Sequence, residues 1–194
     1  MPLYLVFIDF KKAFDSIELQ SIWDALEKYG IDAGDIEIIK LIYANASSSI
    51  NVGSSSANIN VQKGVRQGDT LSPILFILTL QLALDRVNWE RGIHIGESLL
   101  AHLDFADDLV LCSRTLEGLQ SLLDQVSTHA RDVGLHINVQ KTKWMSNISN
   151  DEIILLNNQE DKLFTGHPNP KDSKKKLQEE YVLVGMRLTK PNNS

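Results

Sequence analysis

Three aspartates lie where carboxylates suggest metal-dependent chemistry. Asp9 falls within the apolar run 4–10, where a carboxylate costs several kcal/mol unless it is paired, metal-bound or able to reach water at the strand end. Asp107 and Asp108 follow a Phe-Ala dipeptide, a setting in which aspartate also commonly shapes a turn. If two strands bring these carboxylates to one sheet edge, they would hold two hard cations about 3.5–4 Å apart, as in nucleotidyl transfer. Strand-end hydration and turn formation are the alternative explanations.

A glutamine–glycine pair and a lysine are further candidates. Gly68, after Gln67, lies between a predicted hairpin and a predicted buried helix, where glycine allows a ligand to approach the backbone, although a plain turn glycine fits equally well. Lys141 offers a cation or a proton, and a solvated strand-end lysine is the commoner explanation. Four histidines show no metal-ligand spacing and are not expected to be ligands: His94, His102, His129 and His136.

Hydrophobic periodicity and capping residues predict the elements that position these residues. An aromatic and β-branched run predicts a buried strand over 4–10, and Asp15 with Glu18 suggests a capping box for a helix ending at Gly30. A central, buried helix is predicted from Ser72 to about residue 89. The other predicted elements are a helix over 36–46 capped by Asp35, a hairpin of 48–52 with 57–62, a hairpin unit over 93–113, a helix over 115–133, and strands over 136–138 and 142–146. This order predicts an α+β fold with helices covering one face of an antiparallel sheet.

The sequence changes character after Ser146. Residues 147–180 contain two prolines and a run of three lysines, and are predicted to be a polar loop or disordered segment. Residues 181–194 are predicted to form a last strand and a tail. The compact domain is therefore expected to span residues 1–146.

Composition narrows the class of protein. Of the 194 residues, 43% are hydrophobic and 23% charged, as in ordinary globular domains. The single cysteine, Cys112, excludes an internal disulfide and a Cys-based zinc site, and fits a reducing, intracellular setting. No apolar stretch approaches the roughly 20 residues that a membrane helix needs, so no membrane partner is expected. The net charge of −6, with 12 Lys and Arg against 18 Asp and Glu in residues 1–150, argues against a free-standing nucleic-acid binder.

Four segments in order along the chain resemble the palm motifs of reverse transcriptases, specifically those of non-LTR (LINE-type) retrotransposons. They are FIDFKKAFD over 7–15, RQGDTLSPILF over 66–76, FADD over 105–108, and GLHIN with a following Lys-Thr over 134–142. The resemblance covers roughly residues 3–146. It implies a polymerase palm whose reaction is RNA-directed DNA synthesis, the addition of dNTPs to a primer 3′-hydroxyl.

The resemblance implies a catalytic role for four residues. Asp9, Asp107 and Asp108 match the carboxylates that bind two Mg²⁺ ions, for which Mn²⁺ is a substitute. Lys141 matches the motif lysine proposed to protonate pyrophosphate.

It also implies four substrate-binding residues. Phe14, five residues after the first aspartate, matches the bulky residue that excludes the ribose 2′-hydroxyl and so selects dNTPs. Gln67 and Gly68 match positions that line the incoming nucleotide, with Arg66 the basic residue beside them.

The sequence departs from the family pattern in several places. The chain begins about eight residues before the first catalytic aspartate, so the fingers, thumb and endonuclease regions are expected from a longer polyprotein. The other implied partners are an RNA template, a DNA primer and dNTPs, in the nucleus or the cytoplasm. Asp104 stands where relatives commonly carry a basic residue, and is expected to repel template or triphosphate. Residues 181–185 only loosely match the primer-grip hairpin.

Three functions follow from these observations. The first is the palm of an active reverse transcriptase. The second is a catalytically inactive, retrotransposon-derived remnant or co-opted fragment. The third, a bare nucleic-acid-binding module, lacks the basic face and surface aromatics that such a module requires.

Overall fold

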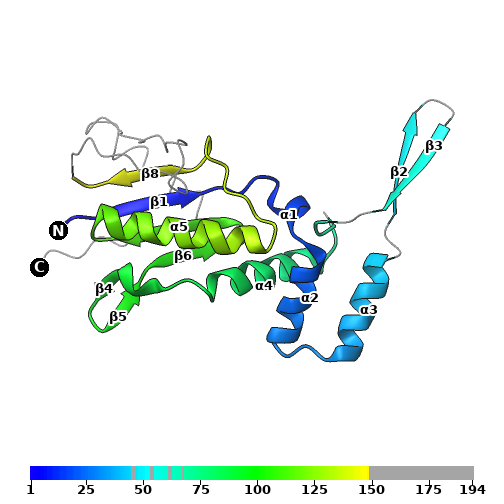
Figure 1. The fold of residues 1–194 in the computed structure, drawn as a ribbon, viewed down its shortest axis with the longest axis horizontal. Coiled ribbons are helices and arrows are strands. Elements are labelled where there is room, and N and C mark those ends of the chain that lie inside the picture. The colour runs from blue at the N-terminus through cyan, green and yellow to red at the C-terminus, as the bar shows by residue number, and fades with distance from the viewer. Residues whose placement is uncertain (45–46, 53–54, 61–62, 67, 149–194) are drawn as a thin grey trace, which may run out of the picture.

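The computed structural model describes residues 1–44, 47–52, 55–60, 63–66 and 68–148 of the chain. Its elements are β1 (Tyr4–Ile8), α1 (Ala13–Ser16), α2 (Leu19–Lys28), α3 (Ala33–Ala44), β2 (Ser47–Val52), β3 (Ser55–Asn60), α4 (Ser72–Leu84), a 3₁₀ turn (Trp89–Arg91), β4 (Ile93–Ile95), β5 (Ser98–Leu100), β6 (His102–Phe105), β7 (Asp108–Ser113), α5 (Leu116–Asp132) and β8 (Lys143–Ser146) (Figure 1). The predicted α+β class is confirmed.

The main sheet has four antiparallel strands in the order β6-β7-β1-β8. Side chains alternate between its two faces along β1, where Tyr4, Val6 and Ile8 are buried. Leu111 and Leu109 of β7 lie opposite Val6 and Ile8, so these four side chains share the face that meets the core. Two smaller hairpins, β2–β3 and β4–β5, lie outside this sheet.

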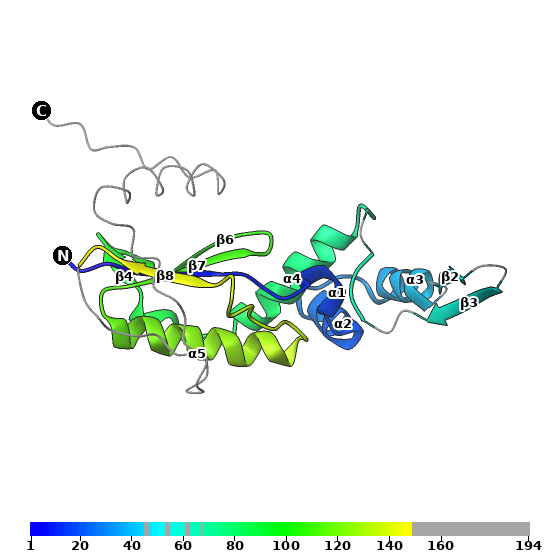
Figure 2. The same ribbon diagram turned by 90° about the horizontal axis from the view of Figure 1, so that it is seen from above.

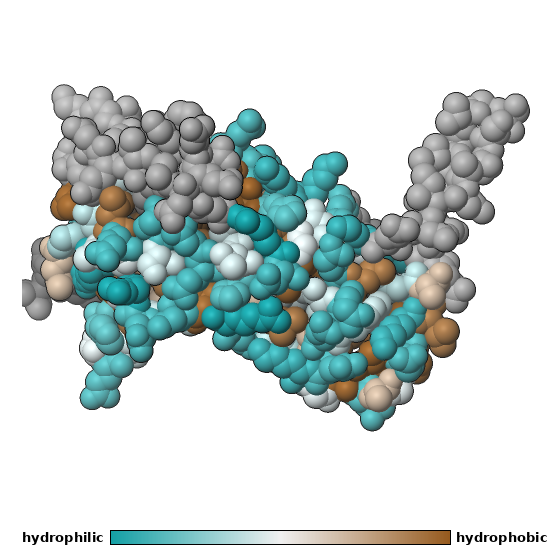
Figure 3. Space-filling view, in the orientation of Figure 1, coloured by the Kyte–Doolittle hydropathy of each residue, from teal (hydrophilic) through white to brown (hydrophobic). Residues whose placement is uncertain are grey.

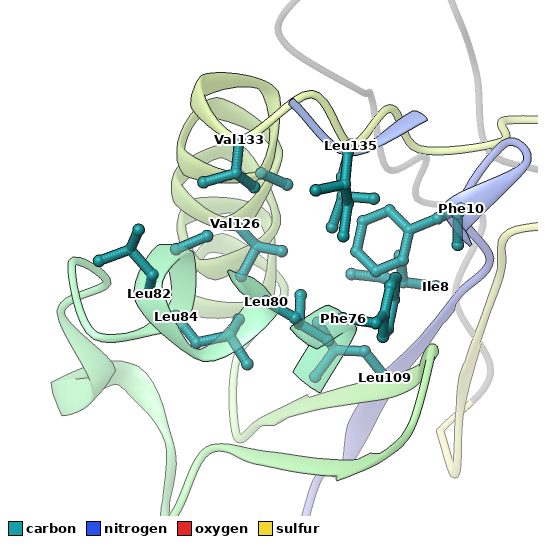
Figure 4. Packing of buried hydrophobic residues seen from close by; sticks show 14 of the residues in the cluster. Ile8, Phe10, Phe76, Leu80, Leu82, Leu84, Leu109, Val126, Val133 and Leu135 are labelled. Carbon is teal, nitrogen blue, oxygen red and sulfur yellow. The ribbon is translucent and has the colours of Figure 1, made fainter. Parts of the chain in front are cut away.

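Helices cover one face of the sheet. α5 lies along β7 and β1, and α4 packs against both α5 and α2 (Figure 2). Thr115 caps α5 by accepting a hydrogen bond from the Gly118 backbone N–H, as expected of a helix N-cap. The core between helices and sheet is apolar, with Phe76 and Leu80 of α4 lying against Ile8 and Leu109 of the sheet (Figure 4).

Two predicted helix starts were wrong. Asp15 lies inside the short helix α1, because the chain turns into an extended conformation at Ile17 before α2 begins. The side chain of Glu18, the residue before α2, makes no capping hydrogen bond. Asp35 lies in the first turn of α3, and the side chain of Asp32 instead accepts the Gly34 N–H at the start of that helix.

Other predicted boundaries also differ. α4 ends at Leu84, and the region predicted to continue it to residue 89 leads into the 3₁₀ turn. The hairpin unit over 93–113 divides into two hairpins, β4–β5 and β6–β7. The predicted strand over 136–138 contributes one bridge, between Ile137 and Phe10. Residues 149–194 lie outside the described residues, and with them the predicted strand over 181–188.

The face shown in Figure 3 is mostly hydrophilic over α5, and apolar residues gather at the end formed by α2 and α3. Ile38 and Leu41 of α3 are among the exposed large apolar residues. Within the described part of the chain, no helix combines the length and apolarity needed to cross a membrane.

A polar network ties the C-terminal ends of α2 and α4 together. Asp85 accepts hydrogen bonds from the Lys28 ammonium, from the Tyr29 hydroxyl at 2.9 Å and from the Gln81 amide at 2.7 Å. These hydrogen bonds, that from Lys28 above all, lower the pKa of Asp85. Burial, and then the bond to Asp85, raise the pKa of Tyr29 to about 12. The network therefore stabilises the ionised form of Asp85 in the folded protein.

We expect Asp85→Asn to destabilise the fold by about 1 kcal/mol at pH 7, a modest value because the side chains are partly exposed. Since folding lowers the pKa of Asp85, its contribution is present above the unfolded value of 3.8 and is lost as the pH falls through the folded pKa. Urea unfolding at pH 7 and at successively lower pH should show the difference from wild type shrinking in acid. Glu37→Gln, which breaks the exposed Lys40–Glu37 pair, is the matched control and should leave stability unchanged. Equal losses of stability in Asp85→Asn and Glu37→Gln would contradict the stabilising role assigned to Asp85.

Candidate active site

The sheet brings two of the predicted metal ligands to the same edge. Ile8 of β1 lies opposite Leu109 of β7, and the next pair in this antiparallel register is Asp9 with Asp108. Partial burial, together with the negative charges of Asp107 and Asp9, raises the pKa of Asp108. Asp107 and Asp9 contribute to this shift because their carboxylates lie near that of Asp108.

The β6–β7 hairpin presents Asp107 and Asp108 at its tip. Phe105 pairs with Asp108, which leaves a connection of two residues, Ala106 and Asp107. Ala106 has a φ of 57°, in the left-handed region that residues other than glycine rarely adopt. Strained residues of this kind are concentrated at functional sites. Here the left-handed conformation of Ala106 forms the tight turn that carries the two adjacent carboxylates.

The Asp9 backbone is fastened to the segment before β8. Its N–H donates to the Thr142 hydroxyl at 3.2 Å, and its carbonyl accepts the Asn138 N–H at 2.7 Å. Thr142 is buried. Its hydroxyl accepts the hydrogen bond that the Asp9 N–H would otherwise donate to a carbonyl of a neighbouring strand. The Lys141 ammonium lies 3.8 Å from Asp9 Oδ2, so the predicted catalytic lysine and the first aspartate are brought together as an ion pair.

The chemistry of these donors fits a divalent cation. Asp9 Oδ1 is buried and, within the described residues, makes no hydrogen bond, although a buried carboxylate oxygen normally has a partner. Hard carboxylate oxygens are the ligands that Mg²⁺ prefers. Even so, no group of three or more His, Cys, Asp or Glu side chains in the described part of the chain is arranged to hold a metal ion. The carboxylates therefore share one sheet edge without forming a finished coordination shell.

Phe14 is held in place from two directions. Its ring stacks on that of Phe76 with 4.6 Å between centroids and 14° between planes. Its backbone carbonyl accepts the Val65 N–H at 2.7 Å, and the Gly64 N–H donates to the carbonyl of Ile17 at the same distance. These bonds attach the segment carrying Phe14 to the one that leads into the predicted substrate-binding loop.

The three predicted residues of the substrate-binding loop, Arg66, Gln67 and Gly68, differ in their surroundings. The Arg66 guanidinium donates to the Ile42 carbonyl at 2.7 Å and lies 5.5 Å from the centre of the Tyr43 ring, so it holds the end of α3. Gly68 has a φ of +88°, and a Cβ built on it would meet no atom of the described residues within 4 Å, which leaves its surroundings there open to a ligand. Gln67 lies outside the described residues.

Three of these supporting residues were not predicted from the sequence: Phe76, Thr142 and Tyr43. Phe76 and Thr142 lie within the segments that carried the family resemblance, so that resemblance was the available signal. Their contacts join positions far apart in the chain, and no local pattern predicts such contacts.

Asp104 lies on the edge strand β6, with Oδ1 3.4 Å from His102 Nε2. Burial lowers the pKa of His102, although Asp104 opposes the shift. His102 also packs on Trp89, with 4.0 Å between ring centroids. The lowered pKa makes the imidazole less able to offset the Asp104 carboxylate, and the repulsion of phosphates by Asp104 stays a prediction.

Comparisons with known proteins agree with these motifs. A family described as "Reverse transcriptase (RNA-dependent DNA polymerase)" matches residues 2–181. The chain is 40% identical over 139 residues to the retrovirus-related Pol polyprotein from type-2 retrotransposable element R2DM of Drosophila melanogaster, covering 71% of this chain and 13% of that protein. It is 37% identical over 140 residues to the corresponding polyprotein from the R2 element of Nasonia vitripennis, covering 72% of this chain and 14% of the relative. The chain thus spans only about an eighth to a seventh of these relatives.

The fold also has a relative among solved structures. Apo telomerase from Candida tropicalis, truncated from its C-terminal domain, superposes with a TM-score of 0.62 and 16% sequence identity, over 78% of this chain and 32% of that one. At this identity the likeness concerns the fold alone, and the shared fold is that of a polymerase palm.

Proposed function

Because the chain belongs to the reverse transcriptase (RNA-dependent DNA polymerase) family, we propose that it supplies the nucleotide-adding site of an RNA-directed DNA polymerase. Its reaction would be the template-directed transfer of a dNTP to a primer 3′-hydroxyl. The observation that carries the proposal is the antiparallel register of β1 and β7, whose extension by one pair brings Asp9, directly after β1, opposite Asp108, the first residue of β7, with Asp107 on the adjoining turn.

The proposed metal ligands are Asp9, Asp107 and Asp108. Reverse transcriptases generally use divalent metals, and we propose that the ions here are two Mg²⁺, with Mn²⁺ as a substitute. When bound, such ions would activate the primer hydroxyl and neutralise the triphosphate and the departing pyrophosphate. The partnerless Oδ1 of Asp9 and the crowding that raises the pKa of Asp108 both support this assignment, since a cation would relieve each.

Lys141 holds the second oxygen of Asp9 in the proposed site. Its ammonium supplies positive charge next to the Asp9 carboxylate. Because Lys141 is largely exposed, it can also deliver a proton to a leaving phosphate, the role that its motif position implies. Arg66, engaged with the end of α3, would act on the nucleotide by positioning the loop that contains Gln67 and Gly68.

The proposed substrates are an RNA template, a DNA primer and dNTPs, which places the reaction in the nucleus or the cytoplasm. The matched relatives are polyproteins, and this chain spans 13–14% of them. We propose that fingers, thumb and endonuclease regions of a longer polyprotein complete the enzyme. Those regions would supply the positive charge that a nucleic-acid-binding surface requires and that this acidic chain lacks.

Primer extension by the purified chain on an RNA template, with all four dNTPs and Mg²⁺, tests the function. The expected result is extension that stops at the template position complementary to an omitted dNTP. The second candidate is an inactive remnant, favoured by the lack of a finished metal-binding group among the described residues. Failure to extend the primer, with or without Mn²⁺, would favour a remnant, or a fragment that needs the fingers and thumb of the longer polyprotein.

Sugar selection by Phe14 gives a prediction of its own. We expect Phe14→Ala to reduce the preference for dNTPs over rNTPs by about ten- to a hundredfold, because the space left by the ring would admit the 2′-hydroxyl. The ratio of kcat/KM values for dATP and ATP in single-nucleotide addition measures the effect. Phe14→Tyr keeps the ring and should keep the preference. An unchanged ratio in Phe14→Ala would exclude the gating role.

A further inference from the structure

We infer that Phe76 is a specificity-determining residue that acts by positioning the Phe14 ring, an inference that rests on the proposed polymerase function. The two residues come from distant parts of the chain, Phe14 from α1 and Phe76 from α4. Their rings stack almost in parallel, with centroids 4.6 Å apart and 14° between planes. Sequence motifs assign the sugar-selecting role to Phe14 alone.

The backbone of Phe14 is fixed independently of its side chain. Its carbonyl accepts the Val65 N–H at 2.7 Å, and the next turn is pinned where the Gly64 N–H donates to Ile17. A Cβ at Gly64 would lie only 2.7 Å from the Cα of Asp15, so the two segments are in direct backbone contact. The freedom left to Phe14 is rotation of its side chain.

Phe76 restricts that rotation. It is 0% exposed, and its ring lies among Ile8, Leu80 and Leu109 in the core (Figure 4). In a close-packed interior a buried ring keeps one orientation. Phe14, by contrast, is half-buried, so one side of its ring meets the core and part of it faces outward. A stacked pair with one immobile member fixes the second ring in one rotamer.

A side chain that excludes the 2′-hydroxyl by steric overlap must keep its ring in one position. A 2′-hydroxyl adds one oxygen atom, and a ring able to rotate away would admit it at little cost. By holding the Phe14 ring against the core, Phe76 makes the overlap with a ribose unavoidable. The side chain on α4 would therefore set the degree of sugar discrimination without touching the nucleotide.

The test compares Phe76→Leu with Leu123→Val in single-nucleotide primer extension by the full chain, using dATP and ATP. Phe76→Leu removes the stacking ring but keeps an apolar side chain. Leu123→Val also trims a fully buried side chain, on α5 and outside the stacked pair. We expect Phe76→Leu to reduce the dNTP preference about three- to tenfold, chiefly through a lower KM for ATP, and Leu123→Val to leave it unchanged.

A double variant shows whether Phe76 acts through Phe14. In the Phe14→Ala background, Phe76→Leu should cause no further loss of preference. Urea unfolding of wild type, Phe14→Ala, Phe76→Leu and the double variant gives a second readout. The double variant should lose less stability than the sum of the losses in the two single variants, because the stacking of the two rings is lost only once. This second readout does not depend on catalysis.

The outcomes separate this inference from the function on which it rests. If Phe14→Ala reduces the preference for dATP over ATP and Phe76→Leu does not, the sugar-selecting role of Phe14 is supported and the positioning role of Phe76 is overturned. Additive stability losses would likewise overturn it, since the rings would then be uncoupled. A wild-type chain that extends no primer would count against the proposed function itself, and the inference would fall with it.

Discussion

Asp108→Asn is expected to abolish primer extension and, at the same time, to stabilise the fold. Asparagine keeps the shape of the side chain but removes a carboxylate that the proposed reaction needs to hold metal, so we expect a loss of about a thousandfold or more in rate. The same change removes the repulsion from Asp107 and Asp9 that helps to raise the pKa of Asp108. A change that only damaged folding would lower activity and stability together.

The stability gain should depend on pH. Because folding raises the pKa of Asp108, its contribution to stability is fully present below the unfolded value of 3.8 and is lost as the pH rises through the folded pKa. The advantage of Asp108→Asn over wild type should therefore be largest at neutral pH and vanish below pH 3.8. Urea unfolding across this range measures it.

Asp104→Asn is the matched control, since it makes the same chemical change on the neighbouring strand β6. It should retain extension, because the proposed metal site does not include Asp104. Wild-type rates in Asp108→Asn, or equal losses in the two variants, would contradict the assignment of Asp108.

Gly64→Ala is expected to cause a large loss of stability next to the candidate site. Gly64 has a φ of +82°, and a Cβ there would lie 2.7–2.8 Å from backbone atoms of Asp15, which are more costly to displace than the end of a flexible side chain. Strain in the backbone and steric overlap together should cost about 3 kcal/mol. The Phe14 segment would also be pushed away from the loop that contains Gly68.

Gly30→Ala isolates the first of these effects, the strain of the backbone. Gly30 also has a positive φ, +77°, but in the part of the chain that the structure describes a Cβ there would meet no atom within 4 Å. It should cost only about 1 kcal/mol, the strain of the backbone alone. Chemical denaturation of both variants gives the difference, and similar losses would show that the approach of Gly64 to Asp15 is not tight in solution.

The periodic parts of the fold were predictable from the sequence, and helix ends were less so. The helix predicted over 115–133 was confirmed as α5 (Leu116–Asp132), because hydrophobic periodicity is a local feature that the helix itself satisfies. Asp15 was misplaced because the same residue types suit either a cap or the first turn of a helix. The choice depends on Ile17, Gly64 and Val65, whose backbone bonds form only when distant segments meet.

The candidate site shows the same division. The carboxylates were predicted to meet because strands β1 and β7, read as apolar runs, bring their ends together. The family resemblance suggested Phe14 and Lys141, but it gave no sign that Thr142 holds Asp9 or that Arg66 bonds to the end of α3. Those contacts depend on tertiary packing, which spacing along the chain does not encode.

Divalent-metal binding by Asp9, Asp107 and Asp108 distinguishes a working polymerase site from a folded remnant. Titration of the full chain with Mn²⁺, followed by electron paramagnetic resonance, measures it directly and without nucleic acid. We expect wild type to bind Mn²⁺, Mg²⁺ to compete for the same sites, and the Asp107→Asn, Asp108→Asn double variant to lose binding while remaining folded. Equal Mn²⁺ binding by the two proteins, or none by wild type, would contradict a metal site built from these three residues.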